Sequence, residues 1–356
     1  MNQIARIREE LSKRGLDALL VTDEKNQRYA AGFPFTDGAV LVGKDRAFLI
    51  TDSRYIEAAE QQAEGAEVRL FDKAHPLSAK LREALDEIRA EKIAAEDQSL
   101  SHAAFRAWEK KLGVHLEDAG DLFRTLRAVK TEEEIASMIR AQRISEAALE
   151  EVLHIIKPGM TEREAAAELV YRMLRHGSEG NSFDPIVVTG SKTSMPHGVP
   201  GDKVIRAGDF VTMDFGCLKD GYCSDMTRTV AVGFATDEMK NVYYTVLKAQ
   251  LAGIAAVHAG VLGKDIDSAA RKVITDAGYG QYFGHGFGHC LGLEIHEPPF
   301  AGPTGNMPLH AGSLSSAEPG IYLPGRFGVR IEDVMIIRED HAEVITRAPK
   351  SELIVL

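Results

Sequence analysis

The chain has 356 residues, of which 44% are apolar and 27% charged, a composition typical of a globular protein with more than one domain. Its net charge of −11 argues against nucleic acid or an anionic membrane as the main partner. Three cysteines without a C-x-x-C pair indicate free thiols in a reducing compartment. Because no signal peptide is visible and no apolar run approaches the ~20 residues that span a bilayer, we expect a cytoplasmic protein.

The first third of the chain alternates between helix and strand patterns. Such alternation predicts an α/β domain, which we place at residues 1–126. Helices are expected over 2–14, 53–64, 77–90 and 101–112, and strands over 16–22, 39–43, 47–52, 67–71 and 92–96.

The second domain, residues 127–356, contains two pairs of predicted helices with strand patterns around them. The sequence T-E-R-E at Thr161 is a capping box with Glu164, which marks one helix start. One helix of each pair lies between two glycines of equal spacing, so two similar α/β halves related by a pseudo-two-fold axis are expected. The helices are expected over about 131–156, 161–176, 237–258 and 265–277.

Asp214 and Asp225 lie on two predicted strands within TMDFGCLKDGYCSDMTRT (212–229). A turn centred between residues 219 and 220 makes them face each other, whereas a turn at Asp220-Gly221 makes them diagonal neighbours. Either turn places both on one face of the hairpin, unless a bulge intervenes. Two carboxylates on one face repel unless a cation lies between them, so the pair is either part of a metal site or two solvated aspartates.

The segment GHGFGHCLGLEIHE (284–297) places His285, His289 and His296 close together among glycines. Glycines leave room for a metal or substrate near the backbone, and neutral imidazole is a common ligand of Zn, Mn, Co and Fe. The alternative is a glycine-rich turn with surface histidines. His197, in the loop MPHGVPGD, is isolated, and a lone loop histidine usually has no special role.

Glu318 precedes the turn Pro319-Gly320, and Glu332 lies in the strand pattern VRIEDVMII, two residues after Arg330. Each glutamate alone is more often structural or exposed. A buried one needs a partner, which a metal supplies, while Arg330 would orient a neighbouring carboxylate. Taken together, four carboxylates and one histidine favour a pair of Mn, Co or Zn ions.

The order of these residues resembles the family of aminopeptidase P, prolidase and methionine aminopeptidase. It runs Asp, ten residues, Asp, then HxxxHxxxxxxH, Glu-Pro-Gly and VRIED. The pattern GLDALLVT…NQRYAAGF…LITDSRYIEAA resembles the leading domain of aminopeptidase P and prolidase, which methionine aminopeptidases generally lack. The resemblance implies a pita-bread α/β fold for residues 127–356, two divalent ions with Mn before Co or Zn, and a homodimer.

The resemblance also implies a role for each matching residue. Five would be metal ligands: Asp214, Asp225, His289, Glu318 and Glu332. Asp225 and Glu332 would bridge both ions, and Glu318 would also act as general base. His296 would stabilise the tetrahedral intermediate. The matches that would line the site, orient substrate or support a ligand are His197, His285 and Arg330.

Three features depart from the family pattern. Cys290 stands where the family often has glycine, and SLSSA precedes Glu318 where relatives commonly carry an apolar strand. Phe300 follows the H-E-P-P sequence near a position where some prolidases have an arginine for the carboxylate of a terminal proline. We therefore expect an Xaa-Pro aminopeptidase, acting on a small peptide with proline second, with an Xaa-Pro dipeptidase as the alternative. A creatinase-like C–N hydrolase and a non-catalytic binding protein are more distant.

Overall fold

The computed structural model describes residues 3–356. The chain divides into two compact units, the first ending at Leu126 and the second spanning Arg127–Leu356. Among the described residues, none of the helices combines the length and the apolar character needed to cross a bilayer.

The first unit is built on a six-stranded mixed sheet in the order β4–β3–β2–β1–β5–β6. Strands β1, β2 and β3 pair antiparallel, and the outer pairs are parallel. Apart from Gly38 at the start of β2, the central strands are buried along their whole length, which explains their continuous apolar sequences. The elements are α1 (Gln3–Arg14), β1 (Ala18–Val21), α2 (Glu24–Ala31), β2 (Gly38–Gly43), β3 (Ala47–Thr51), α3 (Ile56–Gln62), β4 (Glu67–Leu70), α4 (Leu77–Ile88), β5 (Ile93–Ala95), α5 (His102–Leu112), β6 (Leu116–Asp118) and α6 (Leu122–Ala128).

A buried carboxyl group, that of Glu96, lies at the end of β5. Its Oε2 accepts the backbone N–H groups of Thr22 and Asp23 at 2.6 and 3.0 Å, and its Oε1 accepts the Asn26 amide at 2.7 Å. Burial raises the pKa of Glu96 to about 7, against these hydrogen bonds. The group therefore makes the stability of this unit depend on pH.

We expect Glu96→Gln to remove that dependence. Because the folded pKa is raised above the ordinary value of 4.5, the contribution is full below pH 4.5 and is lost as the pH rises through about 7. The loss reaches about 3 kcal/mol. Glutamine has the same shape as glutamate and is neutral. The Asn26 amide can rotate so that the hydrogen bond between residues 26 and 96 is kept. Thermal unfolding between pH 4.5 and 8 should show a flatter profile for the variant, and parallel profiles would contradict the assignment.

The second unit has two helix pairs, α7 with α8 and α9 with α10. Capping boxes start α7 at Thr131 and α8 at Thr161, the latter as the sequence predicts. Glycines with positive φ follow corresponding helices in the two halves, at positions 159, 177, 260 and 278. The helices are α7 (Glu132–Leu153), α8 (Glu162–Arg175), α9 (Asp237–Ala255) and α10 (Gly263–Asp276).

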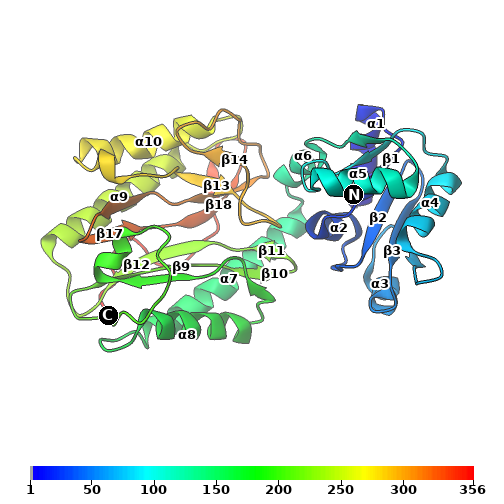
Figure 1. Ribbon diagram of the computed structural model, residues 1–356. Coiled ribbons are helices and arrows are strands. Elements are labelled where there is room, and N and C mark those ends of the chain that lie inside the picture. The colour runs from blue at the N-terminus through cyan, green and yellow to red at the C-terminus, as the bar shows by residue number, and fades with distance from the viewer. Residues whose placement is uncertain (1–2) are drawn as a thin grey trace. The chain divides into compact units, whose positions relative to one another are not determined.

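Short sheets lie between the two helix pairs (Figure 1). One apolar cluster packs α7 and α8 against the three-stranded sheet β12–β9–β8, and another packs α9 and α10 against β15 and β18. This is the two-half arrangement expected from the sequence. The strands are β7 (Gly180–Asn181), β8 (Ile186–Thr189), β9 (Phe210–Phe215), β10 (Cys217–Lys219), β11 (Tyr222–Cys223), β12 (Met226–Ala231), β13 (Gly288–Cys290), β14 (Glu297–Ala301), β15 (Leu314–Ala317), β16 (Gly320–Leu323), β17 (Phe327–Arg330), β18 (Asp333–Ile337) and β19 (Ala342–Val344).

The predicted strand through VRIEDVMII is wrong in one respect. Strand β17 pairs with β16, whereas β18 pairs with β15 and β19 in another sheet. Ile331 and Glu332 lie outside both strands. The chain leaves one ladder before it enters the next, and this break places Glu332 on a two-residue link rather than within a strand.

Candidate metal centre

Asp214 and Asp225 lie on the same face of a hairpin whose turn is Asp220-Gly221. Both turn residues have positive φ, and Thr227 pairs with Asp214 across β9 and β12. Asp225 precedes Thr227 by two residues, so the aspartates are diagonal neighbours, the second of the two predicted arrangements. The ladder is interrupted beside them at Gly216, where a side chain would overlap the backbone of Ser224.

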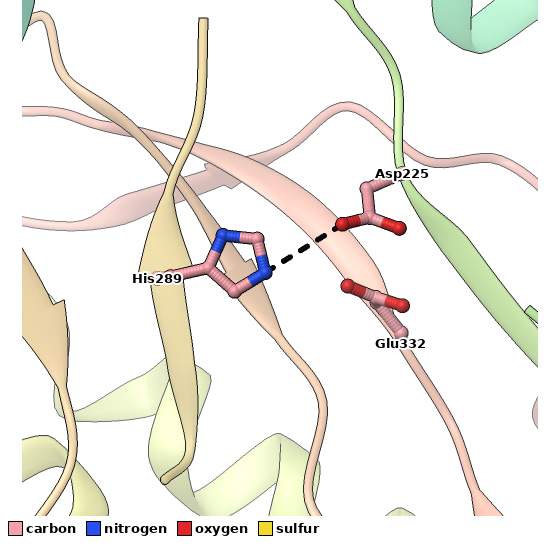
Figure 2. Close-up of side chains that lie close together, drawn as sticks. All are labelled: Asp225, His289 and Glu332. Atoms are coloured by element: carbon pink, nitrogen blue, oxygen red, sulfur yellow. Dashed lines mark ion pairs between the residues drawn. The ribbon is translucent and has the colours of Figure 1, made fainter. Parts of the chain in front are cut away.

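Three side chains converge from separate segments of the chain, as Figure 2 shows. Asp225, His289 and Glu332 each offer one ligand atom, and these atoms all lie within 4.8 Å of one another. His289 Nε2 is 3.6 Å from Asp225 Oδ2 and 3.2 Å from Glu318 Oε1. Glu318 therefore borders the group of three, and the first half of the domain contributes Asp225 while the second contributes the others.

The orientation of His289 is set by its neighbours on β13 and β15. Its Nδ1 is 3.1 Å from Cys290 O, and because a carbonyl only accepts, Nδ1 carries the hydrogen and Nε2 faces the carboxylates. Ser316 Oγ accepts the His289 N–H at 3.0 Å and lies 3.1 Å from Glu318 Oε1. Burial lowers the pKa of His289, but the hydrogen bond and charge of Glu318, with Asp225, raise it to about 9.

Asp214 is turned toward Arg330 and lies outside the group of three. Arg330 Nη2 is 2.5 Å from Asp214 Oδ2, Nη1 donates to Tyr322 Oη at 2.8 Å, and Nε donates to Thr227 Oγ1 at 3.0 Å. Arg330 is only 4% exposed. The guanidinium of Arg330 is held by Thr227 and Tyr322 and binds the Asp214 carboxylate, as expected for a residue that orients a carboxylate.

The charges of the centre are unbalanced without a cation. Burial raises the pKa of Asp225 and of Glu332, and the negative charge of neighbouring carboxylates raises both further. Glu332 Oε2 accepts from Thr227 Oγ1 at 2.7 Å, whereas the buried Oε1 has no hydrogen-bond partner among residues 3–356. An orphaned carboxylate oxygen beside another carboxylate and an imidazole nitrogen fits a divalent metal ion.

A cleft of about 670 Å³ opens onto these groups. All the site residues predicted from the sequence line it: His197, Asp214, Asp225, His285, His289, His296, Glu318, Arg330 and Glu332. Its apolar walls include Phe183, Ile295 and Phe300. The cleft therefore combines a charged floor with apolar sides, which suits a small ligand that has one polar reacting bond.

The three further histidines occupy different depths of the cleft. His296 lies with its ring centroid 4.4 Å from that of His289. His285 is deeper, where its Nε2 accepts from Tyr322 Oη at 2.8 Å because its Nδ1 donates to Gly286 O. His197 is exposed, in the loop that follows the short 3₁₀ helix Gly190–Ser194. Of these three histidines, only His285 has hydrogen bonds at both ring nitrogens within residues 3–356.

Three residues that no sequence motif singles out also contact the centre: Thr227, Ser316 and Tyr322. Thr227 follows Asp225 by two residues in a strand pattern, so strand periodicity was an available signal. Ser316 belongs to the segment SLSSA, which departs from the family pattern. Its hydroxyl group contacts both His289 and Glu318. Cys290 is buried and does not line the cleft, and burial raises the pKa of its thiol to about 12.

Comparison with known proteins gives matches along almost the whole chain. Residues 136–339 match the model of metallopeptidase family M24, and residues 3–129 match that of the creatinase/prolidase N-terminal domain. A Xaa-Pro dipeptidase of Pyrococcus horikoshii is 34% identical over 98% of both chains. A solved Xaa-Pro dipeptidase from Bacillus anthracis is 42% identical over 99% of both chains with a TM-score of 0.94. A solved X-Pro aminopeptidase from Thermotoga maritima is 37% identical over 97% of this chain and 99% of its own, with a TM-score of 0.92.

Proposed function

The chain belongs to metallopeptidase family M24, and from this premise we propose that it hydrolyses the bond between an N-terminal residue and a following proline, with dipeptides as its main substrates. The observation that carries the proposal is the convergence of Asp225, His289 and Glu332 at the floor of a peptide-sized cleft. Proline forms a tertiary amide without an N–H and has a fixed φ, so its bonds need a dedicated site.

Two divalent ions would be held by five residues: Asp214, Asp225, His289, Glu318 and Glu332. Manganese is our first choice, with cobalt or zinc as alternatives, because the donors are mostly carboxylates. Once bound, the ions supply the Lewis acidity of the reaction. Asp225, His289 and Glu332 converge within 4.8 Å, and Asp214 and Glu318 would complete the ligand set.

The protein's own groups would position the substrate and move its protons. Glu318, whose Oε1 lies 3.2 Å from His289 Nε2 and which lines the cleft, accepts a proton from the attacking water. His296 donates a hydrogen bond to the oxygen that becomes negative in the transition state. His285, fixed by Tyr322, and the exposed His197 orient the peptide and relay protons.

Preference for dipeptides over longer peptides reverses the order expected from the sequence. The relatives support it, because two of the three proteins compared above are dipeptidases. Arg330, the one arginine or lysine among the described residues that line the cleft, is already bonded to Asp214. The carboxylate of an Xaa-Pro dipeptide would therefore meet His197 or His296. An aminopeptidase is the second candidate, favoured by the Thermotoga relative and by Phe300 at the cleft wall.

Hydrolysis of two peptides tests the proposal. Protein stripped of metal and supplied with Mn, Co or Zn should cleave Ala-Pro, and should cleave Ala-Pro-Ala at least about tenfold less efficiently, which corresponds to 1.4 kcal/mol of discrimination. Comparable values of kcat/KM for both peptides would favour the aminopeptidase instead. Cleavage of neither peptide with any metal would remove the proline-directed proposal. The homodimer and the cytoplasmic location stay predictions.

A further inference from the structure

We infer that Gln250, a buried residue of α9 outside the cleft, is a positioning residue that holds the backbone of Glu318 and Glu332 in register for metal binding. The inference rests on the proposed function, because it takes these two glutamates as metal ligands. Gln250 is fully buried and does not line the cleft. It acts on the centre only through the backbone.

The amide of Gln250 bridges two segments that are far apart in the sequence. Its Nε2 donates to Ala317 O at 2.9 Å and to Ile331 O at 3.2 Å. Ala317 directly precedes Glu318, and Ile331 directly precedes Glu332. One NH₂ group therefore fixes the peptide planes that lead into both glutamates.

The orientation of this amide is set by Lys350. Lys350 Nζ lies 2.6 Å from Gln250 Oε1, and since an ammonium group only donates, the amide oxygen must face Lys350 and the NH₂ must face the two carbonyls. Lys350 is held in turn by an ion pair with the buried carboxylate of Asp333, whose other oxygen accepts from Arg228 at 2.8 Å. Lys350, in the segment that follows β19, thus fixes the orientation of the Gln250 amide.

The two glutamates need this support because neither lies within a strand. Glu318 follows the end of β15, and Glu332 lies on the link between β17 and β18. Outside the ladders, Glu318 N–H bonds to Phe287 O at 2.8 Å and Glu332 N–H bonds to Thr227 O at 3.1 Å. The first bond ties Glu318 to the residue before β13, and the second ties Glu332 to β12. Ala317 also pairs with Asp333 in the β15–β18 ladder, and the Gln250 amide adds a side-chain bridge between the two glutamate segments.

Manganese titration of the metal-stripped protein tests the inference with a matched pair of variants. Gln250→Met keeps the length of the side chain and removes both donors, so we expect a loss of Mn²⁺ affinity of roughly 10–100-fold by calorimetry. Gln142→Met is the control, because Gln142 is also a buried glutamine and its amide has no hydrogen-bond partner within residues 3–356. Its Mn²⁺ affinity should equal that of the wild type.

The outcomes separate the inference from the function on which it rests. Wild-type affinity in Gln250→Met would overturn the inference alone, whereas a wild-type protein that binds no Mn²⁺ would overturn the proposed metal centre as well. Should Gln250→Met not fold, Lys350→Met decides, because that side chain is 19% exposed. We expect Lys350→Met to weaken Mn²⁺ binding and Lys350→Arg to restore it, and unchanged affinity in Lys350→Met would overturn the inference.

Discussion

Replacing Asp225 by asparagine is expected to abolish hydrolysis of Ala-Pro. Asp225 is a member of the group of three, with Oδ2 3.6 Å from His289 Nε2. Asparagine offers one neutral oxygen and an NH₂ group that cannot bind a cation. Loss of the several kcal/mol that a metal contributes to the transition state corresponds to a fall in kcat/KM of roughly 10³-fold or more.

A gain in stability should accompany this loss of activity. Burial and the charge of Asp214 raise the pKa of Asp225, so its ionised form is costly in the metal-free protein at neutral pH. The neutral amide removes that cost, and the metal-free variant should unfold at a higher temperature than the metal-free wild type. Asp202→Asn, at a carboxylate that is 87% exposed, is the control and should change neither quantity. Activity within tenfold of wild type in Asp225→Asn would place the reacting groups elsewhere.

The parts of the centre that depend on local periodicity can be predicted from the sequence. Strand period two places Asp214 and Asp225 on one face, and the Asp220-Gly221 turn fixes which of two registers is formed. The capping box at Thr161 is visible for the same reason, since all its contacts lie within one turn of helix. Helix α2 is missed, because its sequence EKNQRYAA has no regular apolar period.

The parts of the centre that cannot be predicted from the sequence are determined by contacts between segments far apart in the chain. GVRIEDVMII has the pattern of one strand, and it is divided because β17 and β18 find partners in different sheets. Arg228, which donates to the backbone oxygen of Glu332 at 2.5 Å, lies 104 residues away. No window of sequence contains both residues, so a pairing of this kind cannot be predicted from periodicity.

Replacing Glu318 by glutamine is expected to lower kcat by roughly 10²–10⁴-fold, the usual contribution of a general base. Glu318 lies beside His289 at 3.2 Å and lines the floor of the cleft, so its carboxylate is placed to take a proton from a water molecule there. Glutamine has the same shape but cannot take up a proton. The measurement is kcat for Ala-Pro at saturating Mn²⁺, which separates lost proton transfer from weakened metal binding.

Ser316→Ala supplies the graded comparison for this prediction. It removes the hydroxyl that lies 3.1 Å from Glu318 Oε1 and leaves the carboxylate in place. A hydrogen bond to a charged group contributes about 1.5–3 kcal/mol, so a decrease in kcat of about tenfold to a hundredfold sets the upper limit for this variant. If Glu318 acts as the base, the glutamine variant must lose more than the alanine variant when both carry metal. Equal losses would mean that Glu318 contributes only to the geometry of the centre, and the proton would then have to pass to His296 or His285.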